Sequence, residues 1–474
     1  MNINIIALPY KIRNNKIARY FLKVIAVTIL ISCNGNKPKH DFNETYAKAK
    51  IDTAWSDTLP KILEQIVPPT FKDTTYLISD TLNFRKTINT LIDQVSETGG
   101  GTISVTSGMY TVRGSIFMKS NVNLHFSEGA ILNFSPNPED YLPVVKTRWE
   151  GTFIKNYSPL IYAIGQENLA ITGKGVIDGH CEKIWASWKQ KQNPDKIRAR
   201  QMGNDKVPLE KRVFGKGHFL RPAGIQFIEC KNILLEDFTI KSTPFWTINP
   251  ILSENITVSN LTILQGTTND DGVDPESSKN VLIKDCIINT HDDCIAIKAG
   301  RDQDGWPYPP SENIIIRNNE LTNVVGSGFC IGSEMSAGVR NVFFENNTLK
   351  GGDKHAFQFK SNPDRGGFIK EIYIRNVEVV TPVKYGFEFT TDYKGWRGNT
   401  FFTQYSDFYF QNIKMVEAQE VAIKITGRRE EPIKKIYLEN VAFGKSPNPF
   451  ETEYLEDVIL NNVKVKDVPI SKQQ

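Results

Sequence analysis

A short unit recurs along the chain, mainly in its second half, in which an Asn precedes Ile, Val or Leu and a run of alternating apolar and polar positions. Copies begin at Asn121, Asn168, Asn232, Asn255, Asn280, Asn313 and Asn341, and the last five are spaced by 23, 25, 33 and 28 residues. A period of about 20–50 residues is typical of a solenoid, and short β-branched runs bounded by Gly, Asn or Ser are typical of strands. The pattern therefore predicts a stack of β-coils.

Leucine-rich repeats would need leucines at fixed positions and helical stretches, which this sequence lacks. In a β-helix, by contrast, each coil contributes short strands that hydrogen-bond to the neighbouring coils, and aligned Asn side chains form ladders at the turns. We therefore expect an all-β, single-stranded, right-handed parallel β-helix that spans residues 76–474 as one domain.

A short helix is predicted at the start of this domain. Between Asp80 and Gly99, the apolar residues Phe84, Ile88, Leu91, Ile92 and Val95 recur at helical spacing, and three glycines follow. Such a helix would cover the open N-terminal end of the solenoid. Residues 300–310 and 391–407 are expected to form loops that line a binding cleft.

The N-terminus has the pattern of an export signal. Basic residues lead into the apolar run 24–31, which is too short to span a bilayer and ends at Ser32-Cys33. This resembles the lipobox of bacterial lipoproteins, although an ordinary secretory peptide ending near a cysteine is the alternative. We expect residues 1–33 to be a signal peptide with acylation at Cys33, and residues 34–75 to be a linker. The protein would then be an exported periplasmic or cell-surface lipoprotein of a bacterium.

Composition excludes several classes of protein. Hydrophobic residues make up 40% of the 474 residues and charged residues 23%, so the chain can bury a core. The net charge of +4 depends on five basic residues between positions 11 and 23, and nucleic acid is not an expected partner. The five cysteines beyond Cys33 lack C-x-x-C spacing, so we expect mostly buried thiols. No metal or cofactor is expected.

The densest group of candidate catalytic residues is acidic. Asp271 precedes Asp292 and Asp293 by about one coil, 21 residues before Asp292, and neighbouring strands lie roughly 4.8 Å apart. Carboxylates this close repel, which raises the pKa of one of them and creates the acid and base that a glycosidase needs. From spacing alone, a calcium site or Asp-rich turns are equally good interpretations. The stretch Asp302–Gly305 also begins like a calcium loop but lacks the downstream Glu.

The chain between about residues 75 and 445 resembles glycoside hydrolase family 28, the polygalacturonase family of pectin-degrading β-helix enzymes. The similar stretches are residues 173–179 (GKGVIDG), 221–222 (RP), 242–246 (STPFW), 269–275 (NDDGVDP), 292–298 (DDCIAIK), 331–334 (IGSE) and 338–341 (GVRN). The resemblance implies an inverting mechanism, with Asp292 as the general acid and with Asp271 and Asp293 holding and deprotonating the attacking water. Such an enzyme would cleave α-linked galacturonide bonds of polygalacturonan or rhamnogalacturonan, and we expect exo-action.

The substrate-binding candidates lie near these aspartates or in the following coils. They are Asn269, His291, Ser327, His355, Gln358, Lys360 and Tyr385. By the resemblance, Tyr385 matches the active-site tyrosine of the family and Lys360 its substrate-binding lysine.

Two positions depart from the family pattern. Ser327 stands where the family has a supporting histidine, and Gln358 stands where it has an arginine that helps to hold the sugar carboxylate. His291 and His355 lie close by in sequence as possible replacements, although a structural role is the simpler interpretation for both. Loss of the arginine removes a bidentate carboxylate clamp.

The departures leave other functions open. The substrate could be a rhamnogalacturonan, a rhamnoside (as in an α-L-rhamnosidase-type member of the family) or a decorated galacturonide. A non-catalytic pectic-glycan-binding lipoprotein is a further alternative, and a calcium-dependent pectate lyase ranks last because the hydrolase pattern is present. The expected partner is a pectic oligo- or polysaccharide bound by a monomer, and contact with a membrane is expected only through the lipid anchor.

Overall fold

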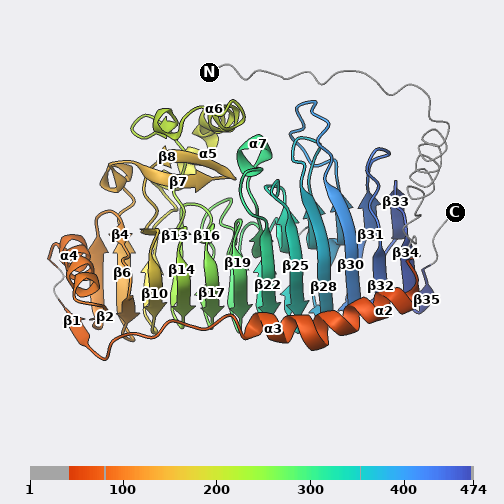
Figure 1. Cartoon of the computed structure of the whole chain (residues 1–474), viewed down its shortest axis with the longest axis horizontal. Helices are drawn as coiled ribbons and strands as arrows, with labels where there is room; N and C mark the ends of the chain where they lie inside the picture. The colour runs from red at the N-terminus through yellow and green to blue at the C-terminus, as the bar shows by residue number, and fades with distance from the viewer. Residues whose placement is uncertain (1–41, 80–81, 353, 471–474) are drawn as a thin grey trace, which may run out of the picture. The chain divides into compact units, whose positions relative to one another are not determined.

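The computed structural model describes residues 42–79, 82–352 and 354–470, and the chain divides after Asn43 into two compact units. In the unit that starts at Glu44, strands of successive coils stack in parallel along one axis (Figure 1). The fold is the predicted right-handed parallel β-helix. The proposed acylation site Cys33 and the signal peptide lie outside the described residues.

Each coil contributes strands to as many as three faces of the solenoid. The first face consists of β1 (Thr75–Ile78), β2 (Gly101–Val105), β5 (Val122–Phe126), β10 (Glu167–Thr172), β14 (Lys231–Glu236), β17 (Glu254–Ser259), β19 (Lys279–Lys284), β22 (Ser311–Arg317), β25 (Val339–Glu345), β28 (Phe368–Val379), β30 (Gln404–Met415), β32 (Ile436–Phe443) and β34 (Val458–Val465). The second face consists of β3 (Gly108–Val112), β6 (Ala130–Phe134), β11 (Val176–Asp178), β15 (Thr239–Lys241), β18 (Thr262–Ile263), β20 (Ile287–Thr290), β23 (Glu320–Asn323) and β26 (Thr348–Lys350), and β26 pairs with the end of β28.

The third face carries the candidate site. It consists of β4 (Ile116–Phe117), β9 (Ile161–Ile164), β13 (Ile225–Ile228), β16 (Ile248–Ile251), β21 (Ile295–Ile297), β24 (Ser327–Gly332), β27 (His355–Lys360), β29 (Val383–Thr390), β31 (Ala418–Thr426) and β33 (Asn448–Glu453). Single bridges through Val273 and Glu276 connect β16 with the coil of β21. The final strand β35 (Val468–Pro469) pairs antiparallel with β34.

The repeated Asn residues form the predicted ladder at the start of the first face. Asn232, Asn255 and Asn280 have positive φ angles of 53°, 57° and 55°, a conformation that Asn tolerates better than most residues. Along the ladder the side-chain amide of each Asn donates to the amide oxygen of the preceding one, over 2.6–3.2 Å from Asn168 to Asn341. The spacing of these Asn residues in the sequence is therefore the number of residues in each coil.

Replacing Asn280 by Ala should destabilise the solenoid locally. Asn280 is 2% exposed, donates to Asn255 and accepts from Asn313 at 2.8 Å, so Asn280→Ala removes the partner of two half-buried amide groups. We expect a loss of about 1–3 kcal/mol in the free energy of unfolding, measured by denaturant titration. Asn462→Ala, at the exposed end of a second ladder, is the control. An equal loss in both variants would contradict the prediction.

The core consists of inward-facing residues stacked from coil to coil. Phe357 stacks on Phe387 with ring centroids 5.1 Å apart, and Phe359 stacks on Phe389 at 4.7 Å. The five described cysteines are buried free thiols, as predicted for that part of the chain. Since Phe357 and Phe359 point inward, the alternate residues of the same strand point out toward the cleft.

The predicted cap is α4 (Phe84–Glu97), which buries Phe84, Ile88, Ile92 and Val95 against the first coil (Figure 1). It ends in a Schellman motif, in which the Gly100 amide donates to the Val95 carbonyl at 2.8 Å. A Cβ on Gly100 would also lie 2.3 Å from the carbonyl oxygen of Asn121, so only glycine fits here. The cap prediction is confirmed.

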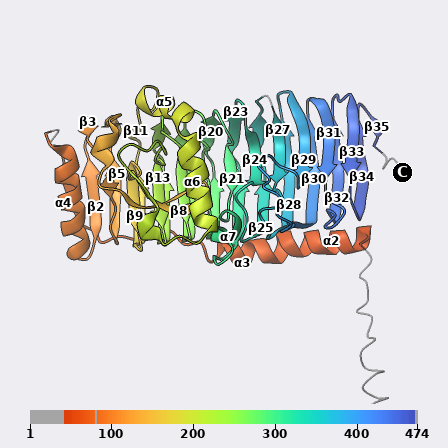
Figure 2. The ribbon, with the colours of Figure 1, turned by 90° about the horizontal axis from the view of Figure 1, so that it is seen from above.

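The linker predicted for residues 34–75 is wrong where that stretch is described. Residues 44–63 form α2 (Glu44–Thr53), a π-helical turn (Ala54–Thr58) and α3 (Leu59–Leu63), which run along the first face (Figures 1 and 2). Trp55 packs edge-on against Phe343, and the Arg375 guanidinium lies 3.7 Å from the Trp55 ring centroid. The stretch is polar overall, but its few apolar residues align on one buried side, a pattern that composition does not reveal.

Insertions lie above the third face. They consist of the hairpin β7 (Val145–Trp149) and β8 (Thr152–Asn156), β12 (Val213–Phe214), the helices α5 (Ile184–Lys191), α6 (Asn193–Asn204) and α7 (Asp302–Gly305), and short 3-10 turns at Pro138–Tyr141 and Leu209–Lys211 (Figures 1 and 2). No helix in the described part of the chain has the length and apolarity that crossing a membrane requires. The insertions cover part of the third face.

Candidate active site

The three candidate catalytic aspartates lie at one corner of the solenoid. Asp292 and Asp293 occupy the bend between β20 and β21, where the chain passes from the second face to the third. Because the backbone bends here, the two consecutive side chains are not forced to opposite sides, as they would be within a strand. The Gly272 amide donates to the Asp293 carbonyl at 3.0 Å, which places Asp271 in the adjacent coil.

A fourth carboxylate holds this bend. Asp270 is 1% exposed and accepts hydrogen bonds from the backbone amides of His291 (3.0 Å), Asp292 (2.9 Å) and Gly266 (2.8 Å). Asp270 therefore positions the candidate catalytic pair. It was absent from the sequence-based candidates, although its place directly before Asp271 marked it as part of the same turn.

Asp293 is stabilised as a carboxylate. Its side chain is buried and accepts from the Ser327 amide at 2.7 Å and from the Lys360 ammonium at 2.9 Å. Burial alone would raise the pKa of Asp293, but the positive charges of Lys360 and Lys298 and the two hydrogen bonds bring it down to about 2. Asp293 is therefore ionised across the ordinary pH range.

The pKa of Asp292 is shifted in the opposite direction. Burial, followed by the negative charge of Asp293, raises the pKa of Asp292 above its ordinary value. Its carboxylate accepts from the Asn269 side-chain amide at 3.2 Å, and it remains partly exposed to the cleft. The neighbouring pair therefore splits into one carboxyl group whose pKa is raised and one whose pKa is lowered.

Asp271 also favours the protonated form. It is 3% exposed, and burial together with the charge of Asp274 raises its pKa well above the ordinary value, against the opposing charge of Lys298 at 3.4 Å. Both carboxyl oxygens of Asp274 are buried and have no hydrogen-bond partner within the described residues. Asp271 therefore lies in a buried acidic pair beside the ionised Asp293.

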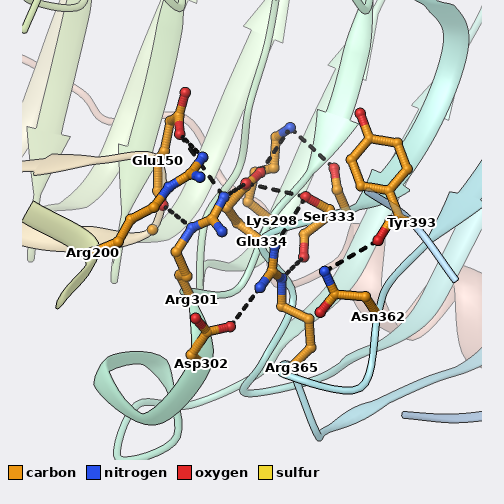
Figure 3. A network of polar contacts seen from close by, with 12 residues as sticks. Glu150, Arg200, Lys298, Arg301, Asp302, Ser333, Glu334, Asn362, Arg365 and Tyr393 are labelled. Carbon is orange, nitrogen blue, oxygen red and sulfur yellow. Dashed lines mark hydrogen bonds and ion pairs between the residues drawn. The ribbon is translucent and has the colours of Figure 1, made fainter. Parts of the chain in front are cut away.

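Lys298 connects this acidic group to a larger charged network (Figure 3). Its ammonium donates to the Gly332 carbonyl at 3.0 Å and lies 3.6 Å from Glu334, which is paired with Arg301. Arg200 of α6 pairs with Glu150, next to Arg301, so the network joins the insertion to the solenoid. Sequence analysis did not select Lys298, although it lies in the same outward-facing register as Lys360.

The stretch Asp302–Gly305, whose sequence begins like a calcium loop, has both of its carboxylates paired with arginines. Asp302 pairs with Arg365 and Arg397, and Asp304 pairs with Arg212 at 2.8 Å. These carboxylates hold α7 against neighbouring loops. The ring of Trp306, just after α7, packs edge-on against Phe401 with centroids 4.8 Å apart, so the two predicted cleft loops contact each other.

The other predicted site residues lie on the two flanks of the aspartates or at the bend itself. Asn269 contacts Asp292 and accepts hydrogen bonds from Lys189 and from Arg221, the latter at 2.9 Å. Ser327, His355, Gln358 and Tyr385 lie on the opposite flank of Asp293, in successive coils of the third face. His291 reaches the bend through its backbone amide, whereas its Nδ1 is buried without a hydrogen-bond partner in the described part of the chain.

Sequence analysis did not identify two further residues near the aspartates, Lys189 and Glu388. Lys189 comes from α5, an insertion outside the repeat, so no periodicity could have identified it. Glu388 follows Gln358 by one coil, is its register partner and hydrogen-bonds to it, so extending the period one step further would have found it.

Gly326 is predicted to be essential for the geometry of the bend. A Cβ at this position would lie 2.3 Å from the carbonyl carbon of Asp292 and from the amide nitrogen of Asp293. Gly326→Ala must therefore displace the peptide that carries both carboxylates, and a shift of about 1 Å can reduce kcat by about 10²-fold. Steady-state kinetics on a cleaved glycan would measure this loss.

Gly444→Ala is the matched control, because its Cβ would meet the Val416 carbonyl oxygen at 2.5 Å, far along the chain from the bend. That variant should lower the melting temperature without lowering kcat. An unchanged kcat in Gly326→Ala would show that the bend tolerates the displacement.

A family model described as glycosyl hydrolases family 28 matches residues 214–467, more than half of the chain. The chain belongs to this family. It is therefore a glycoside hydrolase that acts on O-glycosyl bonds. The family resemblance found in the sequence motifs is confirmed.

The chain is similar to a protein of known structure and to two proteins compared by sequence. The exopolygalacturonase from Thermotoga maritima is 33% identical with a TM-score of 0.81, over 88% of this chain and 98% of that chain. A probable polygalacturonase from Vitis vinifera is 27% identical over 76% of this chain and 70% of its own length. The exo-poly-alpha-D-galacturonosidase from Dickeya chrysanthemi is 27% identical over 69% of this chain and 59% of its own length.

Proposed function

We propose that the protein is an exo-acting hydrolase of α-linked galacturonide bonds in pectin, with an inverting mechanism. The observation that carries the proposal is the split between Asp292, whose pKa is raised, and Asp293, whose pKa is lowered to about 2. A glycosidase needs such a protonated acid and an ionised base on the two sides of the scissile bond. The exo-acting relatives from Thermotoga and Dickeya support this mode of action.

In this mechanism Asp292 donates its proton to the glycosidic oxygen as the bond to the leaving sugar breaks. Asp293 accepts a proton from the water that attacks the anomeric carbon from the other face of the ring. Asp271, which retains a proton in its buried position, orients that water by a hydrogen bond. Lys360 keeps Asp293 ionised, and Asp270 holds the bend in place.

A product profile tests the proposed function. The full-length protein, incubated with homogalacturonan and rhamnogalacturonan, should release short products steadily while the viscosity of the polymer falls slowly. Insensitivity to chelators, and the absence of an unsaturated product absorbing in the ultraviolet, would distinguish hydrolysis from lyase action. Rapid loss of viscosity would contradict exo-action, and binding without cleavage would favour a glycan-binding lipoprotein.

Export and lipidation complete the proposal. Residues 1–33 would direct export, and acylation of Cys33 would tether the enzyme to a membrane surface. Full-length protein should partition into the detergent phase in Triton X-114 extraction, and Cys33→Ala should remain in the aqueous phase. Identical partitioning of the two proteins would contradict lipidation.

A further inference from the structure

A row of polar side chains lies on the outer side of the third face, beyond Asp293. Gln358 on β27 is in register with Glu388 on β29, and Glu388 is in register with Lys424 on β31. Their neighbours in sequence, such as Phe387 and Phe389, point into the core, so this row faces out toward the cleft side. It is the surface that a sugar next to the aspartates would meet.

These side chains form one hydrogen-bonded group. The Gln358 amide donates to the Glu388 carboxylate at 2.7 Å, and His355 Nε2 lies 2.9 Å from the same carboxylate. The ring of His355 stacks on that of Tyr385, with centroids 5.2 Å apart, and the Tyr385 hydroxyl donates to Glu420. The group is therefore preorganised before any ligand binds.

Glu388 brings negative charge to this surface. Burial would raise the pKa of Glu388, but hydrogen bonds from His355 and Gln358 and the charge of Lys424 lower it below the ordinary value. The carboxylate is therefore ionised, with its side chain 13% exposed. A sugar carboxylate placed against it would be repelled, whereas hydroxyl groups could donate to it.

The group is continuous with the catalytic centre. Ser327 donates its backbone amide to Asp293 and its hydroxyl to Gln358, and Lys360, two residues after Gln358, donates to Asp293. Gln358 lies two coils beyond Asp293, which is about 10 Å along the solenoid axis at the usual strand spacing. In addition, the buried Nδ1 of His355 has no hydrogen-bond partner within the described ranges.

The opposite flank of the aspartates is basic. Lys189 and Arg221 both donate to Asn269, which in turn donates to Asp292. Lys196 lies nearby on α6, where burial lowers its pKa. The charged side chains on the two sides of the aspartates therefore differ: Lys189 and Lys196 lie on one side, and the ionised Glu388, with Lys424 next to it, lies on the other.

We infer that the sugar bound over Gln358, Glu388 and Tyr385 is uncharged and is recognised through its hydroxyl groups, whereas the sugar on the Lys189 side carries the carboxylate. The bond that is cleaved then joins a uronate to a neutral sugar. This inference deepens the proposed function and rests on it for the position of the scissile bond. Glu388 is the residue that excludes a second uronate.

The test uses α-linked disaccharides that differ only in the C6 group of one ring. Digalacturonate is compared with the two disaccharides in which either ring carries a primary alcohol in place of the carboxylate. Wild type should show a kcat/KM at least about ten-fold higher on one of the mixed disaccharides than on digalacturonate. In Glu388→Gln, which keeps the shape and removes the charge, this ratio should fall by about ten-fold.

A matched control and a double variant make the test specific. Glu451→Gln removes a carboxylate from the same row two strands further on, where it is exposed, and should leave the ratio unchanged. Gln358→Arg alone should change the ratio little, because the new guanidinium would pair with Glu388, whereas Gln358→Arg with Glu388→Gln should favour digalacturonate. A wild-type preference for digalacturonate that Glu388→Gln does not alter would overturn the inference.

Calorimetric titration of the Asp292→Asn protein with the same disaccharides separates this inference from the proposed function. If Asp292→Asn binds a mixed disaccharide more tightly than digalacturonate but wild type cleaves no substrate, the proposed hydrolase function is refuted. The neutral-sugar subsite is then retained. Equal or tighter binding of digalacturonate would refute the subsite even if wild type is an active hydrolase.

Discussion

Asp292→Asn is expected to reduce kcat by about 10²–10⁴-fold while binding of an oligosaccharide stays nearly unchanged. The amide has the shape of the carboxylic acid and can still accept from Asn269, but it has no acidic proton to give to the glycosidic oxygen. The substitution leaves Lys360, Lys298 and the Ser327 amide beside Asp293, so the base remains ionised. Reducing-end assays would measure turnover, and calorimetric titration would measure binding.

Asp285→Asn is the matched control for this substitution. Asp285 lies in the same coil on the exposed turn between β19 and β20, where it accepts from Asn318 at 3.2 Å, and Asn can make the same contact. That variant should retain wild-type kcat. If Asp292→Asn retains it as well, Asp292 is not the general acid.

Lys360→Met is expected to have the second largest effect. It leaves the buried carboxylate of Asp293 without its closest cation, and breaking a buried pair in this way destabilises a fold by about 3–5 kcal/mol. The same loss should raise the pKa of Asp293 by about 1–3 units. Activity at acidic pH should therefore fall more steeply than activity at neutral pH.

The pH profile of kcat/KM provides the measurement. In wild type the base is lost only as the pH falls through about 2, and the acid is lost as the pH rises through the raised pKa of Asp292. In Lys360→Met the acidic and the basic limb of the pH profile should both move to higher pH. The acidic limb should move further, because Lys360 contacts Asp293 directly. Lys350→Met, which removes an exposed lysine paired with Glu320, should leave the profile unchanged. An unshifted acidic limb in Lys360→Met would contradict the role of Lys360.

The position of the aspartates was predictable because the fold is periodic. The Asn spacing gave the length of a coil, and that length placed Asp271 beside Asp292 and Asp293, as the backbone contact between Gly272 and Asp293 shows. Local patterns likewise predicted α4 and its glycine end, since a helix that covers a core must repeat its apolar residues every three or four positions. Such features depend on neighbours in sequence or on neighbours one period away.

Other features depend on contacts between segments with no periodic relation. Lys189 reaches Asn269 from an insertion 80 residues earlier in the chain, and Trp55 packs on Phe343 from a stretch whose composition resembles a linker. The opposite pKa shifts of Asp292 and Asp293 likewise arise from burial and from the charge of Lys360, which lies 67 residues after Asp293 in the sequence.

The sequence by itself thus determined the solenoid and the meeting of three carboxyl groups, because hydrophobic periodicity and coil length act along the chain. The tertiary structure decided which of those groups has a raised pKa and which has a lowered one, and it placed Glu388 on one side of them. Proton affinity depends on the charges and the solvent within a few ångströms, and in a folded chain these come from distant positions.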